Sequence, residues 1–262
     1  MTRRWLAGRA IALSVSPPQD MAQYGMGPEH LNDALGEISR QLLALGARLI
    51  YGGDLREGGI TKMLFELAAR YSPSLARKDE YAPMIVDVVP YPMHAELTSE
   101  ELIAWEADFA TIAELRYMNQ DGDIWSFATR PERLVQLPTG EWAAALTAMR
   151  NYVTRASDAR IVLGGKTTGY LGRMPGIAEE AFLSAMAEQP LFVVGGFGGA
   201  AQAIARSIAG NECLAIPGTD ERLLVRTANG LDEIELRRLA TSPHIDEVTV
   251  LLTRGLGKLF AV

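Results

Sequence analysis

The chain alternates short apolar runs with longer segments in which apolar residues recur every three or four positions. The short runs are apolar nearly throughout, which is typical of strands covered on both faces. They predict strands at Arg9–Ser16, Ala47–Tyr51, Pro83–Val89, Arg160–Leu163 and Leu191–Val194. The periodic segments predict helices at Glu29–Leu45, Ile60–Tyr71, Glu141–Arg155, Pro175–Glu188 and Ala200–Ala209.

Strands that alternate with helices of this length indicate an α/β fold, because a parallel strand pair needs a long crossover between its members. We therefore expect a Rossmann-like, doubly wound parallel sheet with helices on both faces. The whole chain, residues 1–262, is expected to form a single domain, with a core at about residues 9–210 and a helical extension at about residues 228–262.

Two parts of the chain fit this alternation less directly. The tail from Leu231 shows helical periodicity in two pieces, separated by Ser242-Pro243. We expect Gly255 to end the second piece, because glycine commonly terminates helices. Residues 91–137 mix short apolar pieces with turn signals, and their pattern assigns no fold.

Composition and charge narrow the class of protein. Hydrophobic residues make up 48% of the 262 residues and charged residues 22%, enough for a packed core. The formal net charge of −7 disfavours general nucleic-acid binding, which relies on basic surfaces. The one cysteine excludes an intrachain disulfide, and three scattered histidines predict no metal site, so we expect no cofactor. No apolar run approaches the roughly 20 residues of a membrane span, so we expect a cytoplasmic protein without a membrane partner.

Glycine-rich turns follow several of the predicted strands. Gly52, Gly53 and Asp54 end the second strand. Glycine admits backbone N–H groups close to a phosphate, and Asp54 is suited to accept hydrogen bonds from a ribose. The same residues also suit a tight turn without any ligand. Ser14, at the end of the first strand, is open to the same two interpretations.

The segment from Gly164 to Glu180 is more specific. An apolar strand runs into two glycines, and a loop with cationic side chains leads to a helix start at Pro175-Gly176. Proline at a first helical position and unpaired N–H groups behind it favour anion binding. The residues of this segment expected at a ligand are Gly164, Gly165, Lys166, Tyr170, Arg173, Pro175, Gly176, Glu179 and Glu180.

Glu179 and Glu180 lie in the first turn of the predicted helix. Carboxylates there gain from the helix dipole even without a ligand, so dipole complementarity is the competing interpretation. Of the two we favour Glu179 as the ligand-facing residue, because it is nearer to the Pro175-Gly176 turn.

A third turn, Gly195-Gly196-Phe197-Gly198-Gly199, also follows a predicted strand. Gly196–Ala201 matches G-x-G-x-x-A, formally a dinucleotide fingerprint. No acidic residue follows at the expected distance, so contact with a phosphate or a base is favoured over nicotinamide redox chemistry. The small residues equally suit close packing of a helix on the sheet. Arg150, in the helix before the fourth strand, is assigned either to the ligand edge or to a solvated helix face.

These turns resemble the SLOG superfamily. The resemblance rests on Ile50–Gly53 leading into Gly59 and on Asp158–Gly165 leading to Pro175–Glu179, and it covers most of residues 9–210. The superfamily includes the Lonely Guy phosphoribohydrolases, the DNA-processing protein A domain and the nucleotide-sensing N-terminal region of melastatin-type channels.

Two branches of this superfamily imply different functions. In the hydrolase branch the loop is compact, Pro-Gly-Gly-x-Gly-Thr, with a glutamate three residues after the threonine. Glu179 takes the place of that catalytic glutamate if Gly176 takes that of the threonine. This chain has Leu163 where the hydrolases have proline, a long insertion before Pro175, and no threonine. The long loop and the turn at Gly195–Gly199 are more similar to the sensor branch found in channels and prokaryotic conflict systems.

The resemblance implies binding of a nucleotide-derived ligand, such as ADP-ribose, cyclic ADP-ribose or a related NAD-derived signal. It also implies a sensor that forms homo-oligomers, as dimers or larger assemblies, and acts through a separate effector protein. The alternative is an N-glycosidase that acts on nucleoside 5′-monophosphates, with Glu179 as the catalytic residue. In either case the turns are expected to form one pocket, because ligands of doubly wound sheets bind at the carboxyl ends of the strands.

Overall fold

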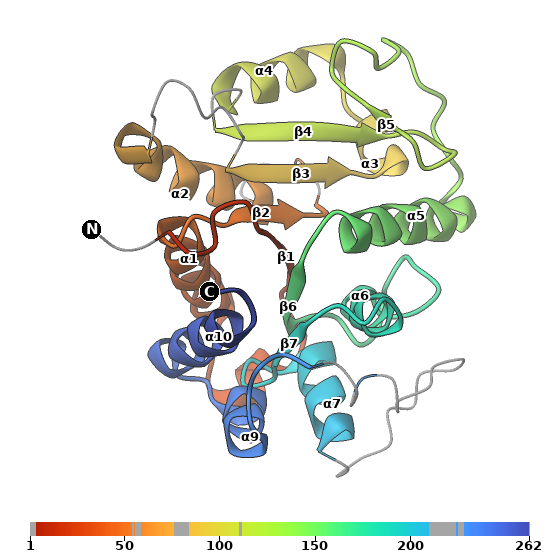
Figure 1. The fold of residues 1–262 in the computed structure, drawn as a ribbon. Helices are drawn as coiled ribbons and strands as arrows, with labels where there is room; N and C mark the ends of the chain where they lie inside the picture. Colours follow the sequence, from red (N-terminus) through yellow and green to blue (C-terminus); the bar gives the residue numbers. More distant parts are fainter. Residues whose placement is uncertain are drawn as a thin grey trace.

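A mostly parallel sheet forms the centre of the molecule (Figure 1). The computed structural model describes residues 4–53, 55, 59–75, 84–109, 112–209, 224 and 228–261. The sheet has seven strands in the order β5-β4-β3-β2-β1-β6-β7. These are β1 (Ala10–Ser16), β2 (Arg48–Tyr51), β3 (Ile85–Val89), β4 (Ala113–Met118), β5 (Ile124–Trp125), β6 (Ala159–Gly164) and β7 (Leu191–Val194). Neighbouring strands pair in parallel except β4 and β5, which are antiparallel.

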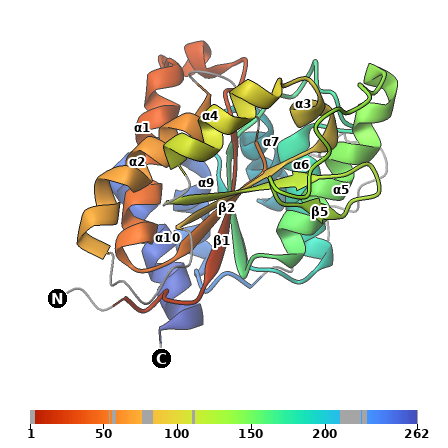
Figure 2. The ribbon, with the colours of Figure 1, turned by 90° about the horizontal axis from the view of Figure 1, so that it is seen from above.

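Helices cover both faces of this sheet, so the predicted doubly wound α/β fold is confirmed (Figure 2). One face carries α1 (Pro28–Ala44), α2 (Ile60–Leu75), α4 (Ser99–Phe109) and α10 (Ile245–Phe260). The other carries α3 (Tyr91–Ala95), α5 (Trp142–Arg155), α6 (Gly176–Met186) and α7 (Gly199–Ile208). The remaining helix, α9 (Glu233–Thr241), lies beside β7 and contacts both α7 and α10. Among the described helices, none has the combined length and apolar content that crossing a bilayer requires.

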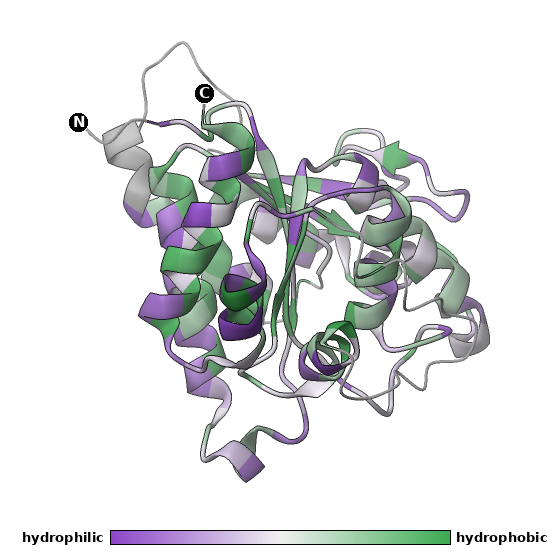
Figure 3. Ribbon diagram, turned by 60° about the horizontal axis from the view of Figure 1, so that its bottom comes forward, coloured by the Kyte–Doolittle hydropathy of each residue, from purple (hydrophilic) through white to green (hydrophobic). Residues whose placement is uncertain are grey.

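Alternate residues of the central strands face opposite cores, which explains why their sequences are apolar nearly throughout. Leu13 of β1 packs in the core below α1 and α10, whereas Ala12 packs in the core below α5. The central strands are accordingly coloured largely as hydrophobic in Figure 3. Two polar residues interrupt the pattern on the α5–α6 face: Ser14 of β1 and Arg160 of β6, both buried.

The chain changes direction across the sheet between β1 and β6. From β1 it proceeds outward through β2, β3 and β4, and it then returns to build β6 and β7 on the other side of β1. The carboxyl ends of β1 and β6 are neighbours, because Ser16 pairs with Gly164. This is the topological switch point, where loops leaving two adjacent strands diverge and leave room for a ligand.

Residues 91–137, to which the sequence pattern assigned no fold, extend the sheet. They contain α3 and α4, the parallel strand β4 and the short antiparallel strand β5. The side chains that hold this region are aromatic and polar: the Tyr117 hydroxyl donates to Glu106, and the Nε2–H of His94 donates to the carbonyl of Met118 at 2.8 Å.

The expectation that Gly255 ends the last helix is wrong. Helix α10 continues to Phe260. Gly255 lies where the helix crosses the sheet, and an added Cβ would come within 2.5 Å of the Phe192 ring and 2.7 Å of the carbonyl oxygen of Asn229. The glycine therefore permits a close approach of helix to strand, a role that local sequence does not distinguish from a helix end.

Candidate ligand-binding site

A cavity of about 690 Å³ opens at the switch point. Its walls are the end of β1, the turn after β2, the loop after β6 and one side of α5. The first residues of three helices also line it: Pro28 of α1, Ile60 of α2 and Gly176 of α6. A volume of this size is typical of small-molecule sites, and helix N-termini favour anionic groups.

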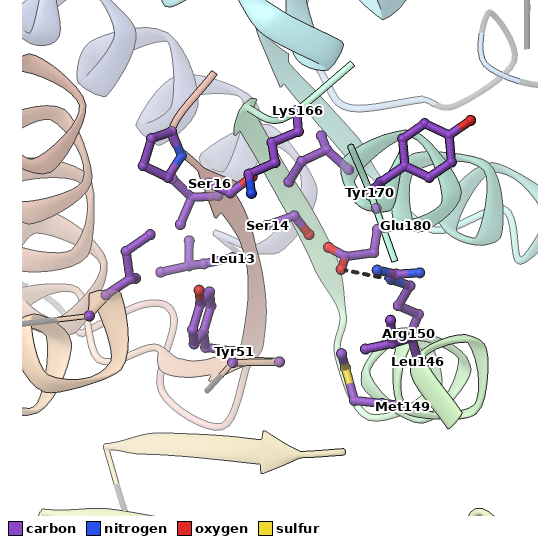
Figure 4. Close-up of a pocket in the computed structure, with 18 of the residues that line it drawn as sticks. Leu13, Ser14, Ser16, Tyr51, Leu146, Met149, Arg150, Lys166, Tyr170 and Glu180 are labelled. Carbon is purple, nitrogen blue, oxygen red and sulfur yellow. Dashed lines mark ion pairs between the residues drawn. The ribbon is translucent and has the colours of Figure 1, made fainter. Parts of the chain in front are cut away.

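The cavity has an apolar and a polar side (Figure 4). Tyr51, Leu146 and Met149 lie together on one side, whereas Ser16 and Lys166 lie on the other. Lys166 is exposed and forms no hydrogen bond or ion pair with the other described residues. Its ammonium group is therefore available to an anionic ligand.

The structure brings together part of the predicted site. The predicted residues that line the cavity are Ser14, Gly52, Gly53, Arg150, Lys166, Tyr170, Gly176 and Glu180. Among the described residues, the predicted ones that do not line it are Gly164, Gly165, Arg173, Pro175, Glu179 and the turn Gly195–Gly199. Asp54 lies outside the described residues.

Glu180, and not Glu179, faces the cavity. Its carboxylate lies between two arginines, with Oε1 3.4 Å from Nε of Arg150 and Oε2 3.1 Å from Nη1 of Arg160. Glu179 points to the other side of α6, where it accepts hydrogen bonds from the hydroxyl of Thr147 and from Arg150. Neighbouring positions on a helix point about 100° apart, so only one of the two carboxylates reaches the ligand side.

Glycines make room for the guanidinium of Arg150. A Cβ at Gly172 would lie 2.9 Å from Nη1 of this arginine, and a Cβ at Gly176 would lie 2.7 Å from Nη2. The Arg150 side chain is only 9% exposed and pairs with both glutamates. Two glycines of the predicted phosphate loop thus serve the packing of an ion pair at the cavity wall.

Arg160 lies behind Glu180, inside the sheet. Its side chain is 1% exposed, and its Nη1 donates to Ser14 Oγ at 2.6 Å and to Glu180 at 3.1 Å. On the far side, Nε donates to Ser184 Oγ at 2.7 Å and Nη2 to Thr154 Oγ1 at 2.9 Å. Burial lowers the pKa of the Arg160 guanidinium, the Glu180 carboxylate raises it, and the Arg150 charge lowers it. The sequence analysis missed this residue, although a charged residue inside an apolar strand was the available signal.

The turn after β6 has a backbone that only glycine adopts readily. Gly164 and Gly165 have φ angles of +67° and +97°, in the left-handed region. A Cβ at Gly165 would lie 2.5 Å from Ile177 of α6. The Gly165 N–H donates to the carbonyl of Ser16 at 2.7 Å, so the turn ties the ends of β6 and β1 together.

The loop that follows is anchored to the loop after β1. The Thr168 hydroxyl donates to Gln19 Oε1 at 3.1 Å, and the Gln19 amide donates back to the Thr168 carbonyl at 3.3 Å. Lys166 and Tyr170 lie on either side of this anchor in the sequence and both line the cavity. The long insertion is therefore part of the cavity wall.

The turn after β7 is occupied by the chain itself. The Asp20 carboxylate accepts from the N–H of Gly199 at 2.9 Å and 3.2 Å, at the start of α7. A Cβ at Gly195 would lie 2.9 Å from Ala205, and one at Gly196 would lie 2.7 Å from the nitrogen of Pro243. Phe197 is fully buried in the core. Here an aspartate takes the position at the helix N-terminus that an anionic ligand would need.

The comparisons with known proteins add one finding. A family model described as SLOG cluster2 matches residues 5–234, most of the chain. No curated protein matches it significantly. In the part of the chain that the structure describes, no group of three or more histidine, cysteine, aspartate or glutamate side chains could hold a metal ion.

Proposed function

The chain belongs to the SLOG superfamily, and from this membership together with the cavity at the β1–β6 switch point we propose that it binds a nucleotide-derived ligand. The observation that carries the proposal is the division of the cavity. A free ammonium group and the N-terminus of α6 border one side, and aromatic and aliphatic side chains border the other. A nucleotide has the same division between phosphate and base.

The phosphate groups of the ligand meet Lys166 and the N-terminus of α6, where both the charge and the backbone N–H groups favour anions. The base lies against Tyr51, Leu146 and Met149. The Glu180 carboxylate accepts a hydrogen bond from a ribose hydroxyl between these two ends. ADP-ribose, cyclic ADP-ribose or a related NAD-derived signal is the ligand class.

Sensing is favoured over hydrolysis because both Glu180 oxygens are already paired with arginines. A carboxylate held in this way is a fixed acceptor for a hydroxyl, whereas an acid–base catalyst must exchange protons with substrate or water. The alternative, hydrolysis of the N-glycosidic bond of a nucleoside 5′-monophosphate, is favoured by the position of the same carboxylate. Facing a ribose, it is suited to stabilise developing positive charge.

The proposal also includes the finer features that the family resemblance implies. The protein acts in the cytoplasm as a homo-oligomer, and it signals ligand binding to a separate effector protein.

Isothermal titration with ADP-ribose, cyclic ADP-ribose, NAD and AMP, combined with chromatography of the products, tests the proposal. We expect saturable binding of at least one ligand without turnover. Release of free base that disappears in Glu180→Gln would establish the hydrolase instead. Absence of binding to all four compounds would overturn both functions. Arg155→Ala, which removes an exposed charge at the end of α5, is the matched control.

A further inference from the structure

Arg160 is a buried cation in the middle of an otherwise apolar strand. Its neighbours along β6 are Ala159, Ile161 and Val162, and the residue paired with it on β1 is Ala12. Replacing a buried ion pair by apolar residues of similar volume is often neutral or stabilising. Fold stability alone therefore gives no reason for a guanidinium at this position.

The hydrogen bonds of Arg160 divide into two sets. Both acceptors of Nη1, Ser14 and Glu180, line the cavity. The acceptors of Nε and Nη2, Ser184 and Thr154, are buried and do not line it. The guanidinium is thus fixed from behind by two hydroxyls and presents one nitrogen to two cavity residues. Because the fork is rigid and planar, fixing one side also fixes the direction of the other.

We infer that Arg160 is a positioning residue that holds the Glu180 carboxylate at the cavity wall for the ligand. Arg150 holds the second oxygen of Glu180, but Arg150 itself lines the cavity and is open to the ligand. Arg160 does not line it, and it acts on the ligand only through Glu180 and Ser14. The inference rests on the proposed binding of a nucleotide-derived ligand at this cavity.

A double-mutant cycle tests this role, with ADP-ribose, cyclic ADP-ribose, NAD and AMP as probes in isothermal titration. The four proteins are the wild type, Arg160→Met, Glu180→Gln and the variant with both changes. Methionine is close in length to arginine and carries no charge. We expect Arg160→Met to weaken probe binding about tenfold in the wild-type background, the range of coupling between contacting residues. In the Glu180→Gln background the same change should alter binding less than about twofold.

Two controls separate positioning from general damage. Ser184→Ala removes a hydrogen bond from the rear of the guanidinium and should change probe binding less than about twofold, because the other contacts still fix the side chain. Arg160→Lys keeps the charge and loses the planar fork. If Arg160→Met does not fold, Arg160→Lys takes its place in the cycle, with weaker binding expected only where Glu180 is present.

Equal losses of binding with and without Glu180 would overturn the positioning role and leave the proposed function standing. A wild-type protein that binds none of the four probes would overturn the proposed function and the positioning role together.

Discussion

The turns after β6 and β7 have similar sequences and different surroundings. Both are glycine-rich, both follow a buried parallel strand and both lead into a helix. The turn after β6 lies at the switch point, and the residues beyond it border a cavity. The turn after β7 is filled by Asp20, by the end of α9 and by Pro243.

The difference shows what a glycine-rich turn indicates. Glycines permit a close approach of backbone, but the approaching group is a ligand in one place and the protein's own chain in the other. The position of the turn relative to the change of direction in the sheet decides which of these applies. Changes in the turn after β7 should therefore affect stability, and changes in the turn after β6 should affect binding.

The largest expected effect is on folding at the turn after β7. Gly196→Ala places a Cβ against the backbone of Ser242 and Pro243, and we expect a loss of about 3 kcal/mol or more in unfolding free energy, the upper end for overpacking. Urea unfolding measures it. Gly36→Ala is the control: it lies in α1 with open space at its Cβ and should stabilise by up to about 1 kcal/mol. An unchanged Gly196→Ala midpoint would mean that this turn is free to open.

The turn after β3 offers a third case at the same edge, built around a histidine. His94 is fully buried, accepts a hydrogen bond from Arg130 at 3.1 Å on Nδ1, and has its pKa lowered by burial to about 4. Between about pH 6.5 and pH 4 the unfolded chain binds a proton that the folded chain does not. Stability should therefore fall as the pH drops through this window, by about 3 kcal/mol in total.

Unfolding of wild type and His94→Gln across this pH range checks the histidine prediction. The stability advantage of wild type over the variant should shrink as the pH falls from 6.5 to 4. An advantage that stays constant over the range would mean that His94 does not carry the pH dependence.

A smaller effect is expected at the turn after β6, and on binding instead of folding. Lys166→Ala should weaken binding of an anionic probe such as ADP-ribose about tenfold, because a charge-assisted contact contributes about 1.5–3 kcal/mol. Its unfolding free energy should stay within about 0.5 kcal/mol of wild type, as usual for exposed positions. Arg155→Ala, with the same change in charge, should leave the affinity unaltered. Equal losses in both variants would reduce the effect to general electrostatics.

The smallest expected effect is at the Asp20 contact. Asp20→Ala removes the carboxylate from the start of α7 and should lower the unfolding free energy by about 1 kcal/mol, the usual contribution of a helix cap. Affinity for ADP-ribose should not change. A gain in affinity would indicate that Asp20 competes with the ligand, and that the turn after β7 is part of the site after all.

The sequence was sufficient for the fold and for part of the candidate site. Apolar runs and helical spacing predicted the parallel strands except β4, because buried strands and amphipathic helices have distinct periodicities. The short antiparallel β5 was not predictable, since its two residues carry no period. Ser14 and Lys166 were placed at the ligand edge because they follow strands.

Tertiary contacts account for the rest. Arg160 acquires its role from Ser14, 146 positions away in the chain, and Asp20 reaches Gly199 across 179 positions. Such pairings leave no local pattern. The choice between Glu179 and Glu180 depends on the rotation of α6 about its axis, which proximity to the preceding turn does not determine.

Hydrogen exchange measured by mass spectrometry, with and without saturating ADP-ribose, tests the central claim most directly. The account predicts that the ligand slows exchange in the segments Tyr51–Gly53 and Lys166–Ile177 and leaves Gly195–Ala201 unchanged. Protection centred on Gly195–Ala201, with the loop after β6 unaffected, would contradict it.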